Sequence, residues 1–134
     1  LTGFAIQILS QPHFQERLQL LRLEMENTSQ EPHTAAELAQ RLNISESYFE
    51  SLYKKLFGIS FRQDVIRMRV ERAKFLVTTT DLPLEQVAEI CGYANEVHFY
   101  RQFKKLTGTS PGKFRRQGNP SEWQIQFAPS ADKR

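Results

Sequence analysis

The sequence has few of the residues that build disulfide bonds, metal centres or catalytic sites. Among 134 residues there is a single cysteine, Cys91, so no disulfide can form within the chain, which fits a reducing cytosol. The three histidines, His13, His33 and His98, are scattered, and neither a nucleophile–base pair nor a phosphate-binding glycine loop is found. No apolar run approaches the ~18 residues of a membrane span, and a secretory signal pattern is absent. We therefore expect no enzyme, no metal or cofactor and no membrane partner.

The net charge is small, but it is unevenly distributed. Lysine and arginine outnumber aspartate and glutamate by 18 to 15. Residues 1–40 carry a formal charge of −3, whereas residues 41–74 carry +4 and residues 96–116 carry +5. Two basic segments in a short chain are the electrostatic pattern expected for a polyanionic partner such as nucleic acid. The alternative is that these charges form an ordinary solvated surface.

The two basic segments belong to a repeat with a period of about fifty residues. Segments 38–60 and 87–110 resemble each other, with one extra residue in the turn of the second copy. The matching pairs are Ala39/Ala88, Glu46/Glu96, Phe49/Phe99, Lys54/Lys104, Lys55/Lys105, Leu56/Leu106, Gly58/Gly108 and Ser60/Ser110. Each copy has the pattern of a helix-turn-helix, so the sequence predicts a protein that places two helices in DNA.

Capping and turn residues predict where the helices begin and end. The expected helices run from Pro12 to a loop at 27–32, from Thr34 to about Leu42, from Glu46 to Phe57, from Ser60 to about Val77, from Pro83 to about Cys91, from Asn95 to about Leu106, and from Gly112 to Arg116. The predicted fold is all-α, with two helix-turn-helix subdomains joined by a long central helix. The helix over 61–77 has two adjacent apolar stripes, as such a connection requires.

The two ends of the chain show a different pattern. Apolar residues alternate at Phe4, Ile6 and Ile8 and again in segment 123–127, which indicates a short strand near each terminus. These strands could pair, or the tail could be packed by Trp123 alone. The expected domains are therefore a linker or remnant of an upstream domain, a first subdomain, a connecting helix, a second subdomain and a tail, at residues 1–12, 13–60, 61–78, 79–117 and 118–134. The first residue is leucine, so we expect a piece of a longer protein.

Helical spacing separates an inner from an outer face on the second helix of each repeat. The residues expected to face the core are Phe49, Leu52, Tyr53 and Leu56 in the first and Phe99, Phe103 and Leu106 in the second. The opposite stripes hold Ser47, Glu50, Ser51 and Lys54, and Val97, Tyr100, Arg101 and Lys104. Arg101 is the strongest candidate base reader, because its guanidinium can bond O6 and N7 of guanine. Glu50 could accept a hydrogen bond from cytosine N4, but its charge repels phosphate. The alternative role of Glu50 and Glu96 is to keep the helix soluble and to compensate the helix dipole, and the sequence favours this alternative for Glu96.

Other polar residues are suited to the phosphate backbone. Lys54, Lys55, Arg62, Lys104 and Lys105 could bind phosphates, a kind of contact that adds salt-dependent affinity without reading sequence. Three further residues, Thr34, Ser45 and Asn95, cap helix N-termini, where backbone N–H groups can also hold phosphate. For each lysine alone, the alternative is a solvated surface charge.

These motifs together resemble the AraC/XylS family of bacterial transcription regulators. The resemblance covers about residues 15–117 and rests on the motifs YFESLYKKLFG, VAEICGY, HFYRQFKKLTG and SPGKFR and on the linker pattern at 69–76. It implies seven helices, with two helices reading successive major grooves. The groove-facing positions implied are Ser47, Glu50 and Ser51 in the first unit and Glu96, Val97 and Arg101 in the second. The sequence departs from the family at Ser51, where many members carry arginine.

The resemblance also implies partners and a location. Members are often activators that contact RNA polymerase in the cytoplasm, and an attached sensor or receiver domain usually regulates them. The competing interpretation is a helical protein-interaction module, which would use the same amphipathic helices but would not need the repeated Lys-Lys pairs. A steep loss of duplex affinity with added salt would separate the two.

Overall fold

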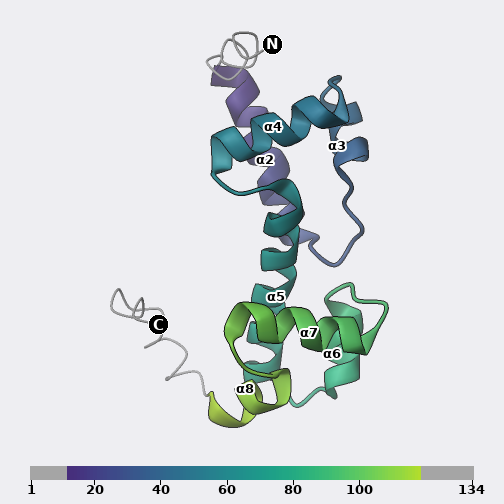
Figure 1. Ribbon diagram of the computed structural model, residues 1–134, viewed down its shortest axis with the longest axis vertical. Coiled ribbons are helices and arrows are strands. Elements are labelled where there is room, and N and C mark those ends of the chain that lie inside the picture. The colour runs from purple at the N-terminus through teal and green to yellow at the C-terminus, as the bar shows by residue number, and fades with distance from the viewer. Residues whose placement is uncertain (1–11, 119–134) are drawn as a thin grey trace, which may run out of the picture. The chain divides into compact units, whose positions relative to one another are not determined.

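The computed structural model describes residues 12–118, and this part of the chain is helical with short connections (Figure 1). In chain order the helices are α2 (Pro12–Asn27), α3 (Ala35–Arg41), α4 (Glu46–Phe57), α5 (Phe61–Thr79), α6 (Leu84–Ile90), α7 (Glu96–Thr107) and α8 (Pro111–Gln117). The predicted all-α fold with seven helices is confirmed over these residues. The strands expected at residues 4–8 and 123–127 lie outside the described residues.

The chain divides into two compact units, and the division falls within α5, between Met68 and Arg69. The first unit contains α2, α3, α4 and the beginning of α5. The second contains the rest of α5 with α6, α7 and α8. Each unit has its own core.

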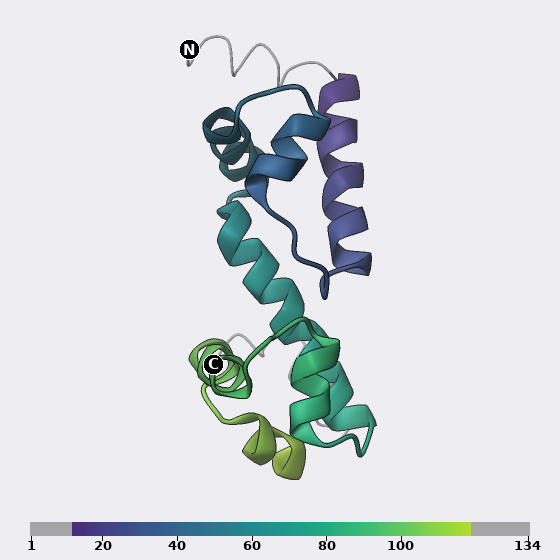
Figure 2. The same cartoon turned by 90° about the vertical axis from the view of Figure 1, so that its right-hand side faces the viewer.

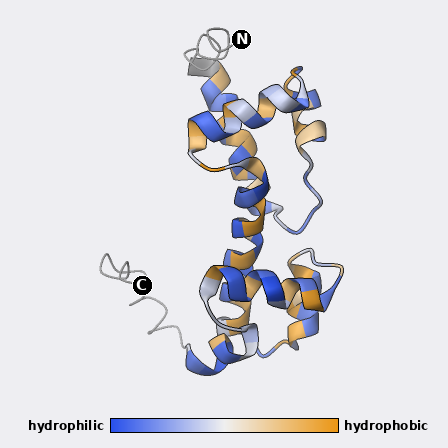
Figure 3. Ribbon diagram, in the orientation of Figure 1, coloured by the Kyte–Doolittle hydropathy of each residue, from blue (hydrophilic) through white to orange (hydrophobic). Residues whose placement is uncertain are grey.

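In the first unit, α2 packs one face into a core that it shares with α3, α4 and α5 (Figure 2). The face predicted from the spacing, Phe14, Leu18, Leu21 and Met25, is buried. The polar and apolar residues that alternate along α2 and α4 in Figure 3 are those of helices with one buried side. Within this core Phe61 packs edge to face against Phe49 and Tyr53, whose own rings are tilted against each other, and the ring centroids are 5.4 to 5.7 Å apart.

In the second unit, the C-terminal part of α5 packs one apolar face into the core, as α2 does in the first unit. Val70, Ala73 and Val77 are buried and have the same spacing as Leu18, Leu21 and Met25. The rest of this core comes from Val87, Ala88, Cys91, Tyr93, Phe99 and Phe103. Cys91 is a small buried residue of this core, and burial raises the pKa of its thiol to about 11.

A buried carboxylate holds three helices of the first unit together. Asp64, in the first turn of α5, is fully buried and accepts hydrogen bonds from Arg22 Nε of α2 at 2.7 Å, Arg67 Nε at 3.0 Å and the Tyr53 hydroxyl of α4. The Arg22 guanidinium also lies 4.5 Å from the Phe57 ring centroid. A buried charge that is paired and hydrogen-bonded in this way is tolerated in a core, but it is costly to leave alone.

The second unit fills the matching positions with apolar rings. A shift of fifty residues relates Tyr53 to Phe103 and Asp64 to Phe114. Phe103 and Phe114 pack edge to face, with ring centroids 5.4 Å apart. The contact between α4 and α5 in the first unit is therefore polar, whereas the matching contact between α7 and α8 in the second unit is aromatic.

One inner-face prediction is wrong. Leu56 packs against the core of the first unit, but the matching Leu106 is 51% exposed. The two units thus differ at the last turn of the second helix of the repeat, although both copies carry leucine at that position. The helix limits differ from those expected by one or two residues.

We expect Asp64→Asn to lower the free energy of unfolding of the first unit by about 3 kcal/mol, because Arg22 and Tyr53 lose a buried charged acceptor. Urea denaturation of the chain measures the change. The control is Arg41→Gln, which breaks the exposed Arg41–Glu24 ion pair and should cost less than about 1 kcal/mol. Equal losses in the two variants would contradict a special role for the buried network.

The Asp64 carboxylate should also make the stability of the first unit depend on pH. Burial alone would raise the pKa of Asp64, but the bonds from Arg22, Tyr53 and Arg67 outweigh it and hold the pKa below the ordinary value. The unfolded chain therefore takes up this proton first, so the stabilisation is present above about pH 3.9 and is lost as the pH falls through the lower folded pKa. Urea midpoints from about pH 6 to about pH 3 should fall less steeply for Asp64→Asn than for the parent chain.

Candidate nucleic-acid interface

The first unit contains a helix-turn-helix formed by α3 and α4. Thr34 Oγ1 accepts a bond from the Glu37 backbone N–H at 3.1 Å, and Ser45 Oγ accepts one from the Tyr48 N–H at 3.2 Å. Between the helices, Asn43 adopts a left-handed conformation with φ of 62°, which asparagine tolerates better than most residues. The predicted caps and turn are confirmed, and they fix where α4 begins.

The second unit repeats the arrangement with α6 and α7. Gly92 makes the turn with φ of 94°, and Asn95 Oδ1 accepts a bond from the His98 N–H at 3.1 Å. We call α4 and α7, the second helix of each motif, the reading helices. Both span 12 residues, both end at a left-handed glycine, and both carry a Lys-Lys pair in the last turn.

Each reading helix has one buried face and one exposed face. The residues predicted to face the core on α4 and α7 are buried or half-buried, apart from Leu106. All the predicted contact residues are exposed: Thr34, Ser45, Ser47, Glu50, Ser51, Lys54, Lys55 and Arg62 in the first unit, and Asn95, Glu96, Val97, Tyr100, Arg101, Lys104 and Lys105 in the second. Val97 is the most exposed large apolar residue of α7, at 62%.

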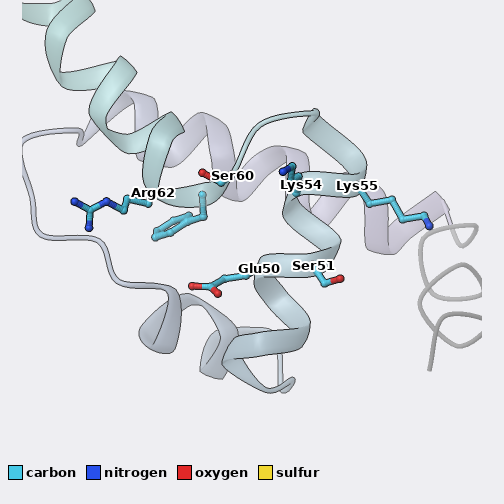
Figure 4. A pocket seen from close by; sticks show the side chains of 7 residues that line it. Glu50, Ser51, Lys54, Lys55, Ser60 and Arg62 are labelled. Atoms are coloured by element: carbon cyan, nitrogen blue, oxygen red, sulfur yellow. The ribbon is translucent and has the colours of Figure 1, made fainter. Parts of the chain in front are cut away.

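A shallow groove of about 620 Å³ runs between α4 and the start of α5 (Figure 4). It is lined by Glu50, Ser51, Lys54, Lys55, Ser60, Phe61 and Arg62. In Figure 4 the Glu50 carboxylate and the Arg62 guanidinium extend to the same side, whereas Lys55 extends away from them. Three cationic side chains and one carboxylate therefore line the groove. Ser60 and Phe61 were not among the predicted contact residues, because the sequence marks them only as a helix cap and a core residue.

On α7 the Tyr100 hydroxyl donates a hydrogen bond to Glu96 Oε2 at 2.5 Å. This bond, together with burial, raises the pKa of Tyr100 to about 12. Sequence reasoning missed the pair, although the spacing of four residues is the signal that could have shown it. Nearby, the buried Tyr93 donates to Gln102 Oε1 at 2.7 Å and packs edge-on against His98. His98 thus flanks the reading face of α7.

The part of the chain that the structure describes contains neither a cluster of metal-binding side chains nor a membrane-spanning helix. Within residues 12–118 no three histidine, cysteine, aspartate or glutamate side chains come together as a metal site would need. None of the helices in this range combines the length and apolarity that crossing a bilayer requires. The exposed faces of α4 and α7, each with its Lys-Lys pair, form the candidate site.

Two helix-turn-helix motifs, each with an exposed second helix that ends in paired lysines, define a DNA-binding protein. A family model described as a helix-turn-helix domain matches residues 38–117. The chain belongs to the AraC/XylS family of transcription regulators. Regulators of this family bind DNA and are not a class of enzyme.

Curated relatives extend beyond the region that they share with this chain. The HTH-type transcriptional regulator YtdP of Bacillus subtilis (strain 168) is 40% identical over 84 residues, which are 63% of this chain and 11% of the relative. The probable transcriptional regulator LumQ of Photobacterium leiognathi is 34% identical over 101 residues, or 74% of this chain and 41% of the relative. The chain thus spans less than half the length of either protein.

Solved structures share the fold. The C-terminal domain of AraT, a response regulator from Geobacillus stearothermophilus, has a TM-score of 0.70 and 33% identity, and the match covers 76% of this chain and 85% of that domain. The DNA-binding domain of AdpA, a global transcriptional factor solved in complex with a target DNA, has a TM-score of 0.67 and 24% identity over 80% of this chain and 92% of that domain. The second likeness shows the fold alone.

The groove beside α4 gives a prediction about charge. Glu50→Gln removes the one carboxylate that lines it, so we expect the affinity for duplex DNA of any sequence to rise about two- to threefold at low salt. Fluorescence anisotropy with an unselected duplex measures this gain. Glu16→Gln, an exposed change on α2 outside the groove, is the control and should have a smaller effect. An unchanged affinity in Glu50→Gln would place the carboxylate away from the phosphates.

Proposed function

We propose that this chain is the DNA-binding part of a bacterial transcription regulator that recognises one duplex sequence through α4 and α7 in successive major grooves. The observation that carries the proposal is the repeated exposed stripe, which occupies the same positions on both reading helices. In helix-turn-helix proteins the second helix enters the major groove, and half-sites are separated by about 10–10.5 bp. The proposed subdomains are residues 13–60 and 79–117, joined by the helix over 61–78.

The proposed base-reading residues lie toward the N-terminal half of each reading helix. They are Ser47, Glu50 and Ser51 on α4 and Glu96, Val97, Tyr100 and Arg101 on α7. Arg101 is exposed and has the chemistry to bond guanine, while Val97 has the chemistry to contact a thymine methyl group. The small hydroxyls of α4 restrict base identity less, so α7 supplies the stronger base readout.

The proposed phosphate contacts flank these stripes. They are Thr34, Ser45, Lys54, Lys55 and Arg62 in the first unit and Asn95, Lys104 and Lys105 in the second. Lysine contacts to phosphate release counterions, so affinity should fall steeply as salt rises. The capping residues stand at helix N-termini, where the backbone N–H groups and the helix dipole favour an anion.

The rest of the regulator is proposed from the relatives. Because the chain spans 11% and 41% of two of them, we propose that a sensor or receiver domain precedes it in the whole protein. The description of AraT as a response regulator favours a receiver. We further propose an activator that contacts RNA polymerase in the cytoplasm, where bacterial promoters are transcribed, and that has no catalytic activity of its own.

Two substitutions on one helix separate base reading from phosphate binding. Arg101→Ala should relax the preference at one base pair, a loss of roughly 1–3 kcal/mol of discrimination, because the bidentate contact to guanine is gone. Lys104→Ala should weaken binding to all sequences alike and lower the salt slope by about 1. Anisotropy titrations with the selected site and its single base-pair variants, at several salt concentrations, measure both effects.

The result that would oppose this assignment is an equal, sequence-blind loss in the two variants. Binding that ignores both salt and sequence would instead favour the protein-interaction module. A duplex of about 20 bp, selected from a random pool and compared with its scrambled version, is sufficient to distinguish these outcomes.

A further inference from the structure

The bond between Tyr100 and Glu96 lies on the exposed face of α7. The two residues are one helical turn apart, the hydroxyl donates to Oε2 at 2.5 Å, and Tyr100 is 36% exposed. A carboxylate only accepts hydrogen bonds, so this donor occupies one oxygen and leaves Oε1 available to another donor. The bond also restricts the Glu96 side chain, which would otherwise sample several rotamers.

The first reading helix has no such pair. In the repeat, Glu96 matches Glu46 and Tyr100 matches Glu50. The α4 positions therefore hold two carboxylates four residues apart, which repel each other and cannot exchange a hydrogen bond at neutral pH. The held carboxylate is a property of the second reading helix, in the turn that begins at its N-cap Asn95.

We propose that Glu96 and Tyr100 form one base-reading unit, in which Tyr100 holds the Glu96 carboxylate so that its remaining oxygen accepts a hydrogen bond from the N4 amino group of a cytosine. This inference rests on the proposed function and assigns a base to part of its site. Cytosine presents an amino donor in the major groove, and glutamate is the side chain that accepts from it. Tyr100 is a positioning residue, because it acts through Glu96.

Three features favour a carboxylate in a groove lined by phosphates. Glu96 is in the first turn of α7, where the positive end of the helix dipole favours a negative charge. A side chain that is already held in place also loses less conformational freedom on binding than a mobile one. Arg101, which follows Tyr100 and is exposed on the same helix, adds a positive charge to this face.

The hydrogen bond itself can be tested without DNA. The pKa of Tyr100 is raised to about 12, first by the bond to Glu96 and then by burial. Glu96→Gln should therefore move this titration back toward the ordinary tyrosine value of about 10. Ultraviolet titration of the 134-residue chain, as a difference between parent and variant, isolates Tyr100 from the other three tyrosines. An identical titration in both proteins would overturn the inference.

The DNA experiment uses a duplex selected by the parent chain from a random pool, together with variants of every base pair. Tyr100→Phe should reduce the preference for cytosine at one base pair about tenfold, and Glu96→Gln should reduce it at the same base pair. The double variant should lose no more than the larger single loss, because the two residues act together. Arg101→Ala should affect a different base pair. Tyr93→Phe, which removes the hydroxyl bonded to Gln102, should leave base preference unchanged.

The outcomes distinguish this inference from the proposed function. If the parent chain selects no sequence, both fail. If it selects a site and Arg101→Ala relaxes one base pair, but Tyr100→Phe leaves every preference unchanged or weakens all sequences equally, only the pairing of Glu96 with Tyr100 is overturned. Thermal melting of each variant, monitored by circular dichroism, shows that the comparison is made between folded proteins.

Discussion

The direction in which each reading helix faces depends on one contact between its inner side and the helix that follows it. In the first unit the Tyr53 hydroxyl bonds the buried Asp64 carboxylate, and Arg22 completes the joint from α2. In the second, Phe103 meets Phe114 edge-on. Successive residues of a helix are about 100° apart, so fixing one inner residue decides which side chains face outward. These two joints therefore fix, together with the apolar spacing, which stripes of α4 and α7 are exposed.

Much of this arrangement could be predicted from the sequence because its signals are local. Ser45 and Asn95 accept bonds from N–H groups three residues ahead, so the start of each reading helix is encoded within four residues. Gly58 ends α4 for an equally local reason, since its φ of 76° is strained for other residues. Apolar spacing then separates the buried face from the exposed one. Together these signals were enough to predict which residues of the candidate site would be exposed.

The features that could not be predicted depend on distant partners or on a choice between partners. Arg22 and Asp64 are 42 residues apart, and nothing near either one signals that they meet. Leu56 and Leu106 occupy the same position of the repeat, yet Leu56 packs against a core and Leu106 is exposed, so the repeat alone does not decide burial at this position. Tyr100 has a local partner in Glu96, but an exposed phenol can equally bond water, so spacing alone does not decide its state.

The two units differ most where they face outward, and this division has a physical meaning. Both retain the N-cap, the left-handed glycine and the Lys-Lys pair, which set the length of the reading helix and its charge at the C-terminal end. Between these shared residues the two copies differ: Ser47 and Ser51 of the first copy match Val97 and Arg101 of the second. The constant residues suit a backbone that is the same in every duplex, and the variable ones suit base edges that differ. A repeat whose ends are conserved between its copies and whose outer middle has diverged is what a protein that reads two different half-sites requires.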